Sequence, residues 1–383
     1  MRYITLFPVL FVLILAGCTD SHVPQWMICA NDQRLTQVDG NVHVIENPKA
    51  GSLTIMDVST FPPVSVETLE NVPCSMIGPP TCVAITPDQK FALVVASQKV
   101  NPENLLKQIP DNKLTVVRLE KGNHKVIQTL ELGNQAAGVE ISPDGKRALV
   151  ANRSDGSLSL LEIADDGTVS VLETFEVGEE KSFVSHAAFS PDGKYVLVTL
   201  QGNDEIALLS LENDRLKTVK KLSVGDGPYC IEFLPCGNFA VVANALDGSV
   251  MLLEVSPADV SVVDRIPVGI VVEGIDVSPD GKWLIANCLE NNSVPQDHVR
   301  RRQTGMVVLL EKQQKTFVTV DVARVGRIPQ AAAFTPDSRF VAIGSNEDQD
   351  IVFFEIKDGK LAPANVRIPC SGGPATLRTS MWN

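Results

Sequence analysis

Polar and ionisable side chains occur at two recurring positions within short apolar runs of the sequence. One group stands near the start of such runs and consists of His186, Tyr229, Glu273 and Gln330. A second group stands further along the runs and consists of Glu140, Glu232, Asp276 and Arg378. Carboxylates that converge in a water-poor site can act as acid or base, and histidine is the usual residue for proton transfer near neutral pH. His186 and Glu273 are therefore the candidate catalytic residues if the fold brings these runs together.

An arginine near such a cluster adds the capacity to bind an anion. A guanidinium group holds a carboxylate or phosphate through forked hydrogen bonds. We therefore expect a binding site for a small anionic molecule, formed by Arg153, Tyr229, Gln330, Arg378, Glu140, Glu232 and Asp276. The alternative is that these groups line a hydrated channel and satisfy one another's hydrogen bonds.

A Ser/Thr-Pro-Asp turn recurs along the chain and indicates how these runs are arranged. Its copies begin at Thr86, Ser142, Ser190, Ser278 and Thr335, and Leu234-Pro235-Cys236 is a degenerate sixth copy. Proline presets the first corner of a type I turn, and aspartate suits the next position. Each turn joins two apolar runs, and two further runs follow it. Four short antiparallel strands in a unit of about 45 residues are typical of a β-propeller blade.

The six turns predict six blades, and both ends of the chain predict a seventh. We expect 41–46, 52–57 and 64–69 to be strands two, three and four of a blade that lacks its first strand. Residues 373–380 match the strand-one pattern of 227–234, so this segment should complete the N-terminal blade and close an all-β, seven-bladed ring. A six-bladed ring with unpaired ends is the alternative. The expected domains are a signal peptide (1–17), a tether (18–40) and the propeller (41–383).

The alternation of strand direction predicts which face carries the function. The start of strand one and the turn between strands two and three must share one face, and the Ser/Thr-Pro-Asp turns must lie on the other. Two long insertions, 98–112 and 290–303, fall between strands two and three. They should rise on the face where the first strands begin, which we call the mouth face. Long loops are where binding usually resides.

The N-terminus carries a targeting pattern. Arg2 precedes an apolar run from Ile4 to Leu15, which is too short for a stable membrane span. The following Leu15-Ala16-Gly17-Cys18 resembles a bacterial lipobox. This resemblance implies cleavage before Cys18, acylation of that residue, and a membrane-anchored extracytoplasmic protein, on the periplasmic side of the outer membrane. An ordinary secretory signal is the alternative.

Composition excludes several classes of protein. The chain has 383 residues and a formal net charge of −13, which argues against a nucleic-acid binder. Its five histidines are not clustered, so no metal signature is present and no cofactor is expected. Nothing in the sequence demands a channel Ca²⁺ or Mg²⁺.

Seven cysteines follow Cys18. Cys74 and Cys82 flank a proline-rich turn and could form a disulfide.

Two sets of motifs resemble known propeller families. Gly225-Asp226-Gly227-Pro228 and the Val-Ala-Asn endings of the second strands resemble YVTN-repeat propellers. The segment 142–146 followed by Val150-Ala151-Asn152-Arg153 is similar to the strand-two signature of the seven-bladed lactonase family, which often carries a histidine near the position of His186. The family includes 6-phosphogluconolactonases and a muconate cyclase.

The sequence leaves two functions open. The lipobox and the lack of a complete catalytic motif favour a lipid-anchored module that binds a ligand or a protein partner at the channel mouth. The resemblance to the lactonase family implies the alternative, a lactonase-like or cyclase-like enzyme that acts on an anionic sugar lactone or a related ring. Convergence of His186, Glu273 and an arginine on one cavity would favour the enzyme.

Overall fold

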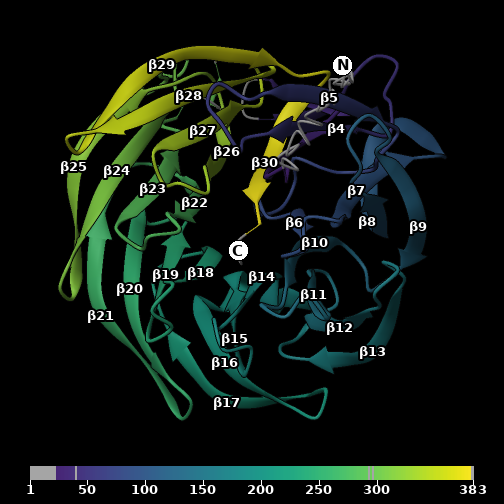
Figure 1. The fold of residues 1–383 in the computed structure, drawn as a ribbon, viewed down its shortest axis with the longest axis vertical. Coiled ribbons are helices and arrows are strands. Elements are labelled where there is room, and N and C mark those ends of the chain that lie inside the picture. The colour runs from purple at the N-terminus through teal and green to yellow at the C-terminus, as the bar shows by residue number, and fades with distance from the viewer. Residues whose placement is uncertain (1–22, 39–40, 292–293, 296, 381–383) are drawn as a thin grey trace, which may run out of the picture.

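The computed structural model describes residues 23–38, 41–291, 294–295 and 297–380. Their strands form seven four-stranded antiparallel sheets and one two-stranded sheet. The seven larger sheets are arranged as blades around a common axis, in chain order (Figure 1). The prediction of an all-β, seven-bladed propeller is therefore confirmed.

The first three complete blades follow one another along the chain. The first consists of β6 (Val83–Ile85), β7 (Phe91–Asn101), β8 (Asn104–Arg118) and β9 (Lys125–Glu131). The second consists of β10 (Ala136–Ile141), β11 (Arg147–Asn152), β12 (Ser157–Ile163) and β13 (Val169–Glu176). The third consists of β14 (Val184–Phe189), β15 (Tyr195–Leu200), β16 (Glu205–Glu212) and β17 (Arg215–Ser223). Two single-turn 3₁₀ helices, η1 (Glu180–Ser182) and η2 (Gln201–Asn203), lie in the connections of this third blade.

Three further blades repeat the pattern. The fourth consists of β18 (Pro228–Phe233), β19 (Phe239–Asn244), β20 (Ser249–Ser256) and β21 (Asp259–Pro267). The fifth consists of β22 (Val272–Val277), β23 (Trp283–Cys288), β24 (Met306–Gln313) and β25 (Thr316–Arg324). The sixth consists of β26 (Pro329–Phe334), β27 (Phe340–Ser345), β28 (Asp350–Lys357) and β29 (Lys360–Pro369).

The seventh blade joins the two ends of the chain. Its strand order is β30 (Gly373–Thr379), β1 (Trp26–Asp32), β4 (Ser52–Asp57) and β5 (Ser65–Glu70). The C-terminal strand is innermost and pairs with β1 in a register that runs from Met27↔Thr379 to Asp32↔Gly373. This pairing agrees with the predicted closure of the ring by the C-terminal strand.

One strand of the seventh blade was predicted wrongly. Strand two is β1, not residues 41–46, and the propeller begins at Trp26 rather than at residue 41. The segment expected to be a tether therefore contains β1 and β2 (Leu35–Val38), and β2 pairs with β3 (Asn41–Val44) in the two-stranded sheet. The reason is burial: all seven residues of β1 are buried between neighbouring blades, whereas β3 is partly exposed. Residues 1–17, Cys18 and 19–22 lie outside the described residues.

The position of a strand within its blade explains its sequence. Second and third strands are packed by neighbouring blades on both sides, so they are continuous apolar runs; Ala148 to Asn152 of β11 are all buried. Fourth strands lie at the rim and alternate, as β25 does. Six of the blades also have a register shift between strands three and four, for example between Leu160 and Leu161. Such bulges increase the twist of a sheet.

The Ser/Thr-Pro-Asp turns connect strands one and two, as predicted. In the second blade the Ser142 hydroxyl donates to Asp144 Oδ1 at 2.6 Å, and the same oxygen accepts the Lys146 N–H at 3.0 Å. Equivalent bonds recur in the turns that begin at Thr86, Ser190, Ser278 and Thr335. The side chains thus satisfy the backbone of a tight turn, which is their main role.

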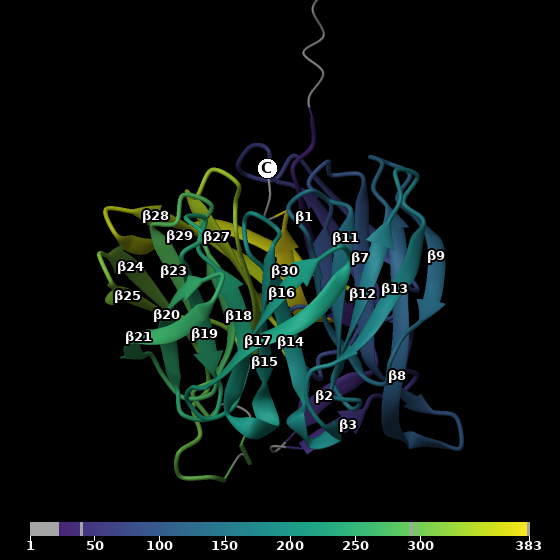
Figure 2. The same cartoon turned by 90° about the horizontal axis from the view of Figure 1, so that it is seen from below.

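The mouth face carries three long connections between strands two and three. The insertion 98–112 extends β7 and β8 into a long hairpin, and 289–305 follows β23. The third connection, in the seventh blade, contains the β2–β3 hairpin. Figure 2 shows the β7–β8 extension and the β2–β3 hairpin at the same end of the ring. Both insertions connect a second strand to a third, so they lie on one face, as expected.

Candidate functional site

The first strands place the predicted polar residues at two heights along the axis. Relative to the turn that follows each strand, Tyr229, Glu273 and Gln330 occupy one position, nearer the mouth face, and we call them the mouth layer. Glu140, Glu232, Asp276 and Arg378 share another position, three residues further along, and form the inner layer. Apart from His186, the two groups recognised in the sequence thus form two separate layers.

The inner layer is a buried cluster of charged groups. Arg378 Nη2 lies 2.9 Å from Glu232 Oε1, and Arg378 Nη1 lies 3.5 Å from Asp276 Oδ1. Glu232 also accepts the Val277 N–H at 3.0 Å, and Asp276 accepts the Phe334 N–H at 2.7 Å. Burial raises the pKa of both carboxyls, although Arg378 opposes the shift. These acids therefore hold Arg378 and the neighbouring strands in place.

Glu140 completes the inner layer without a hydrogen bond to another described residue. Its side chain is buried and, with Arg378, lines a cavity of about 10 Å³, close to the space that one water molecule occupies. Burial raises its pKa to about 8, while Arg378 opposes this shift. Near neutral pH this carboxyl is therefore largely protonated.

The mouth layer contains a carboxylate without a cationic partner. Gln330 Nε2 donates to Glu273 Oε2 at 2.6 Å, and to the Met76 carbonyl at 3.2 Å. No ion pair of Glu273 is found among the described residues. Burial raises the pKa of Glu273 to about 7, and the Gln330 hydrogen bond opposes that shift. Because Glu273 remains partly exposed, it can exchange protons with solvent near neutral pH.

Arg153 approaches the same layer from the connection that follows β11. Its Cζ lies 5.9 Å from the centre of the Tyr229 ring and 5.1 Å from that of Phe183. Its guanidinium donates to the Ser185 hydroxyl and to Gln201 Oε1. These are neutral partners, and within the described chain Arg153 forms no salt bridge. An arginine in this position can bind an anion in its own right.

Tyr229 has both Arg153 and Glu273 in its surroundings. The pKa of its hydroxyl is raised, chiefly by burial and then by the charge of Glu273, while Arg153 opposes the shift. The phenol therefore remains a hydrogen-bond donor at any physiological pH. The surroundings of Tyr229 thus include a cation and a carboxylate, neither of which has an ion-pair partner among the described residues.

His186 lies deeper than its neighbour Ser185. Its Nδ1 accepts the Ile231 N–H at 3.3 Å, so the neutral ring carries its proton on Nε2, for which the described residues provide no partner. Burial, helped by Arg378, lowers its pKa to about 3. No direct contact of His186 with Glu273 is found, so the predicted catalytic pair belongs to two different sets of contacts.

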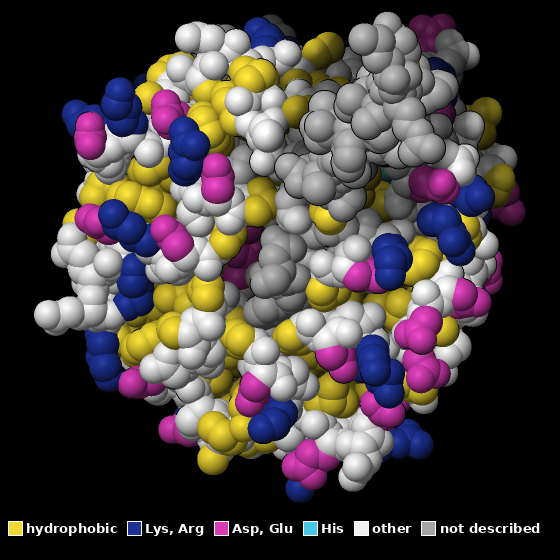
Figure 3. All heavy atoms as spheres, in the orientation of Figure 1, with side chains coloured by type: hydrophobic (Ala, Val, Ile, Leu, Met, Phe, Trp, Pro, Cys, Tyr) yellow, Lys and Arg dark blue, Asp and Glu magenta, His cyan; other side chains and the backbone are white. Residues whose placement is uncertain are grey.

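Larger cavities lie away from the mouth layer, and one of about 610 Å³ is lined by Trp283, Asp337 and Lys360 among others. Two more lie near the channel. One of about 570 Å³ lies on the turn face and is lined by Pro87, Pro143, Pro191, Pro235, Pro279 and Pro336, with Asp276. Figure 3 shows this face, where positive and negative side chains alternate around the rim.

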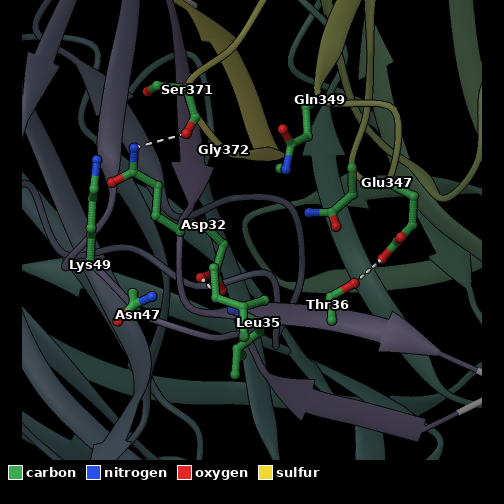
Figure 4. Close-up of a pocket in the computed structure, with 13 residues that line it drawn as sticks. Asp32, Leu35, Thr36, Asn47, Lys49, Glu347, Gln349, Ser371 and Gly372 are labelled. Carbon is green, nitrogen blue, oxygen red and sulfur yellow. Dashed lines mark hydrogen bonds between the residues drawn. The ribbon is translucent and has the colours of Figure 1, made fainter.

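The other cavity, of about 260 Å³, lies beside the β2–β3 hairpin. There the Thr36 hydroxyl donates to Glu347 Oε1 at 2.9 Å (Figure 4). None of these cavities holds Glu273 or Arg153.

The sequence did not reveal several residues that contact the mouth layer or Arg153. Phe183, Gln201 and Met76 come from connections rather than from repeating strand positions, so the repeat pattern contains no signal for them. Met76 lies in the segment that joins the seventh blade to the first, and its carbonyl accepts the hydrogen bond from Gln330 Nε2. Only Phe183 has a conformational signature, a φ of 47°.

In the part of the chain that the structure describes, no group of three or more His, Cys, Asp or Glu side chains is arranged to hold a metal ion. No helix among the same residues has the length and hydropathy of a membrane span.

A family model described as "Lactonase, 7-bladed beta-propeller" matches residues 63–375. The chain belongs to this family. Membership supports the enzymatic alternative raised by the sequence better than the binding module. No curated protein matches the chain.

Solved structures show the same lactonase-family fold. A Bacteroides fragilis protein with a provisional 6-phosphogluconolactonase assignment has a TM-score of 0.70 and 19% identity, and the match covers 95% of this chain and 99% of that one. A Bacteroides uniformis protein with the same provisional assignment has a TM-score of 0.71 and 18% identity, over 93% and 99%. A periplasmic gluconolactonase from Pseudomonas aeruginosa has a TM-score of 0.68 and 19% identity, over 92% and 99%. At these identities the likeness shows the fold alone.

Proposed function

We propose that this propeller hydrolyses the lactone of an anionic sugar acid at the mouth layer. The observation that carries the proposal is the placement of Arg153 and Glu273 around Tyr229, each without an ion-pair partner among the described residues. A site that binds an anion and transfers protons needs both groups free. Membership of the lactonase family and the gluconolactonase names of three neighbours support the same substrate class.

Glu273 is the general base in this proposal. Its carboxylate takes a proton from a water molecule, and the oxygen of that water attacks the lactone carbonyl carbon. The tetrahedral intermediate collapses with cleavage of the ring C–O bond, and the protonated Glu273 returns the proton to the leaving alkoxide. The product is the open-chain hydroxy acid. A base with a pKa of about 7 is well matched to this work near neutral pH.

Two other groups stabilise charge. The Tyr229 hydroxyl donates to the carbonyl oxygen as negative charge develops there. Arg153 binds the anionic substituent of the substrate through its guanidinium. His186 is a poor base because its pKa is so low, but its neutral Nε2–H is a hydrogen-bond donor one level below. We therefore assign the proton transfer to Glu273 rather than to His186.

The test is hydrolysis of 6-phosphoglucono-δ-lactone and of D-glucono-δ-lactone by the purified chain, corrected for spontaneous opening. We expect turnover by the wild type and a loss of about 10²-fold or more in kcat for Glu273→Gln. Arg153→Gln should raise KM for the phosphorylated lactone more than for the neutral one. Glu103→Gln, an exposed carboxylate on the β7–β8 hairpin, is the matched control and should keep full activity. Failure of the wild type to turn over either lactone would reject the proposed function.

The cellular location of the enzyme is the second part of the proposal. We infer from the lipobox-like Leu15-Ala16-Gly17-Cys18 that the protein is held outside the cytoplasm by a lipid on Cys18. In this arrangement the enzyme would meet sugar lactones in the periplasm, and the membrane would be its partner through the anchor alone.

A further inference from the structure

Cys29 and Cys370 lie together at the seam where the ring closes. Cys29 is on β1, the strand that pairs with β30, and is fully buried. Cys370 lies between β29 and β30, and it packs against the apolar cluster that contains Cys29, Met27 and Leu377. The Cys29 thiol donates to Asn31 Oδ1 at 3.2 Å, and its side chain also interacts with that of Cys370. The two side chains are therefore neighbours in one apolar cluster, and both residues are free thiols in the structure.

The backbone around Cys370 is fixed at three points on this side of the seam. Its N–H donates to the Gln349 carbonyl at 2.8 Å. The hydroxyl of the next residue, Ser371, lies 2.6 Å from the Ser52 hydroxyl of β4. The Ser371 carbonyl accepts Gln33 Nε2 at 2.9 Å. These contacts hold the segment against the seventh blade, which carries Cys29.

The other thiols near the seam have different partners. Cys74 Sγ donates to the Asn31 carbonyl at 3.0 Å, and Cys82 Sγ lies 3.0 Å from Thr376 Oγ1. These contacts do not favour the Cys74–Cys82 bridge that the proline-rich turn suggested. Cys236 is exposed and lies far from the seam, in the turn between β18 and β19.

We propose that Cys29 and Cys370 form a redox-active pair, in which a disulfide donor oxidises the two thiols to a bond that locks the ring shut. Cys370 is partly exposed and attacks first. Its thiolate forms a mixed disulfide with the donor and releases one donor thiolate. Cys29 then attacks the Cys370 sulfur and releases the second donor sulfur as a thiolate, which takes up the Cys29 proton. Two protein thiols are thus oxidised, and one donor disulfide is reduced to two thiols.

The chemistry of the two thiols fits this order of events. The neighbouring Cys29 side chain lowers the pKa of Cys370, although burial opposes this, so its thiolate is favoured. Burial raises the pKa of Cys29 well above its usual value, which leaves it a protonated resolving thiol until the mixed disulfide forms. The bond would enclose nearly the whole chain and so restrict the unfolded state strongly.

The test uses the purified full chain, first reduced and then equilibrated with oxidised glutathione. We expect the loss of two titratable thiols and a cross-linked peptide that contains Cys29 and Cys370 in a non-reducing digest. The oxidised protein should melt at a higher temperature than the reduced one. In Cys29→Ser we expect a glutathione adduct on Cys370 and no cross-link, and Cys236→Ser should retain the cross-link.

If Cys29→Ser does not fold, Cys370→Ser provides the same comparison at a partly exposed position, and it should lose both the cross-link and the oxidation-dependent shift in melting temperature. Two free thiols at these positions after exposure to oxidised glutathione would overturn the proposal. A Cys74–Cys82 cross-link in their place would overturn it equally. None of these measurements depends on lactonase activity.

Discussion

Arg378 Nη2 lies 2.9 Å from Glu232 Oε1, and both side chains are almost completely buried, with exposures of 4% and 1%. Arg378 belongs to β30, the last strand of the chain. Closure of the ring therefore delivers the one cation of the inner layer to its three carboxylic acids, so that sheet pairing and charge pairing stabilise the same junction.

Removal of the Arg378 charge should lower the free energy of unfolding. In Arg378→Met the methylene stem is kept, but Glu232 and Asp276 lose their charged partner, and breaking a buried ion pair from one side costs about 3–5 kcal/mol. The free energy of unfolding in urea measures this. Lys315→Met is the control, because the Lys315–Glu254 pair is exposed and should contribute less than about 1 kcal/mol. Equal losses for the two variants would show that the inner layer does not stabilise the ring.

Glu140 should make stability depend on pH. Its folded pKa of about 8 is above the ordinary value of 4.5, so the folded state binds this proton more tightly than the unfolded chain does. The contribution of the protonated Glu140 to the free energy of unfolding is complete below about pH 4.5 and is lost as the pH rises through about 8. The melting temperature of the wild type should therefore fall relative to that of Glu140→Gln between about pH 6 and about pH 9. Parallel curves for the two proteins would contradict this account.

Loss of the last strand should prevent folding rather than cause a local defect. Deletion of residues 372–383 removes β30, which exposes an edge of β1 and leaves the inner-layer acids without Arg378. We expect no cooperative thermal transition and little soluble protein. A melting temperature equal to that of the full chain would show that closure contributes nothing.

The proposed anchor makes a separate prediction. Cys18→Ser should move the protein from the membrane fraction to the soluble extracytoplasmic fraction, or leave an uncleaved precursor, because stable attachment requires the acyl chains at that residue. The net charge of −13 gives no electrostatic attraction to anionic lipid. Fractionation and uptake of labelled fatty acid measure the outcome. Soluble wild-type protein without label would mean that the segment is an ordinary secretion signal.

The periodic part of the fold was predictable because turns and strands repeat. The one misplaced strand shows where this reasoning stops. Ala30-Asn31 carries the same Ala-Asn ending as Ala151-Asn152, and the side chains confirm its role: Asn31 Nδ2 donates to the Ser52 hydroxyl at 3.2 Å, as Asn152 Nδ2 does to that of Ser157 at 3.0 Å. This signal was present, but no Ser/Thr-Pro-Asp turn precedes β1, since its first strand is at the other end of the chain.

The site was only partly predictable for a different reason. Strand positions gave Glu273, Tyr229 and Gln330 correctly as neighbours in one layer, because equivalent positions of adjacent blades meet. They could not show that His186 belongs to deeper contacts, or that Phe183 packs under Arg153, since these depend on side-chain burial and on irregular connections.

The most direct test of the proposed function is the pH dependence of kcat/KM for 6-phosphoglucono-δ-lactone, corrected for spontaneous hydrolysis. The base must be ionised to accept a proton, so the rate of the wild type should rise with pH through a single limb centred at about 7, the pKa of Glu273. In Glu273→Gln this limb should disappear together with most of the activity, at an unchanged melting temperature in the acidic range. An identical limb in Glu273→Gln would contradict the assignment of Glu273 as the base.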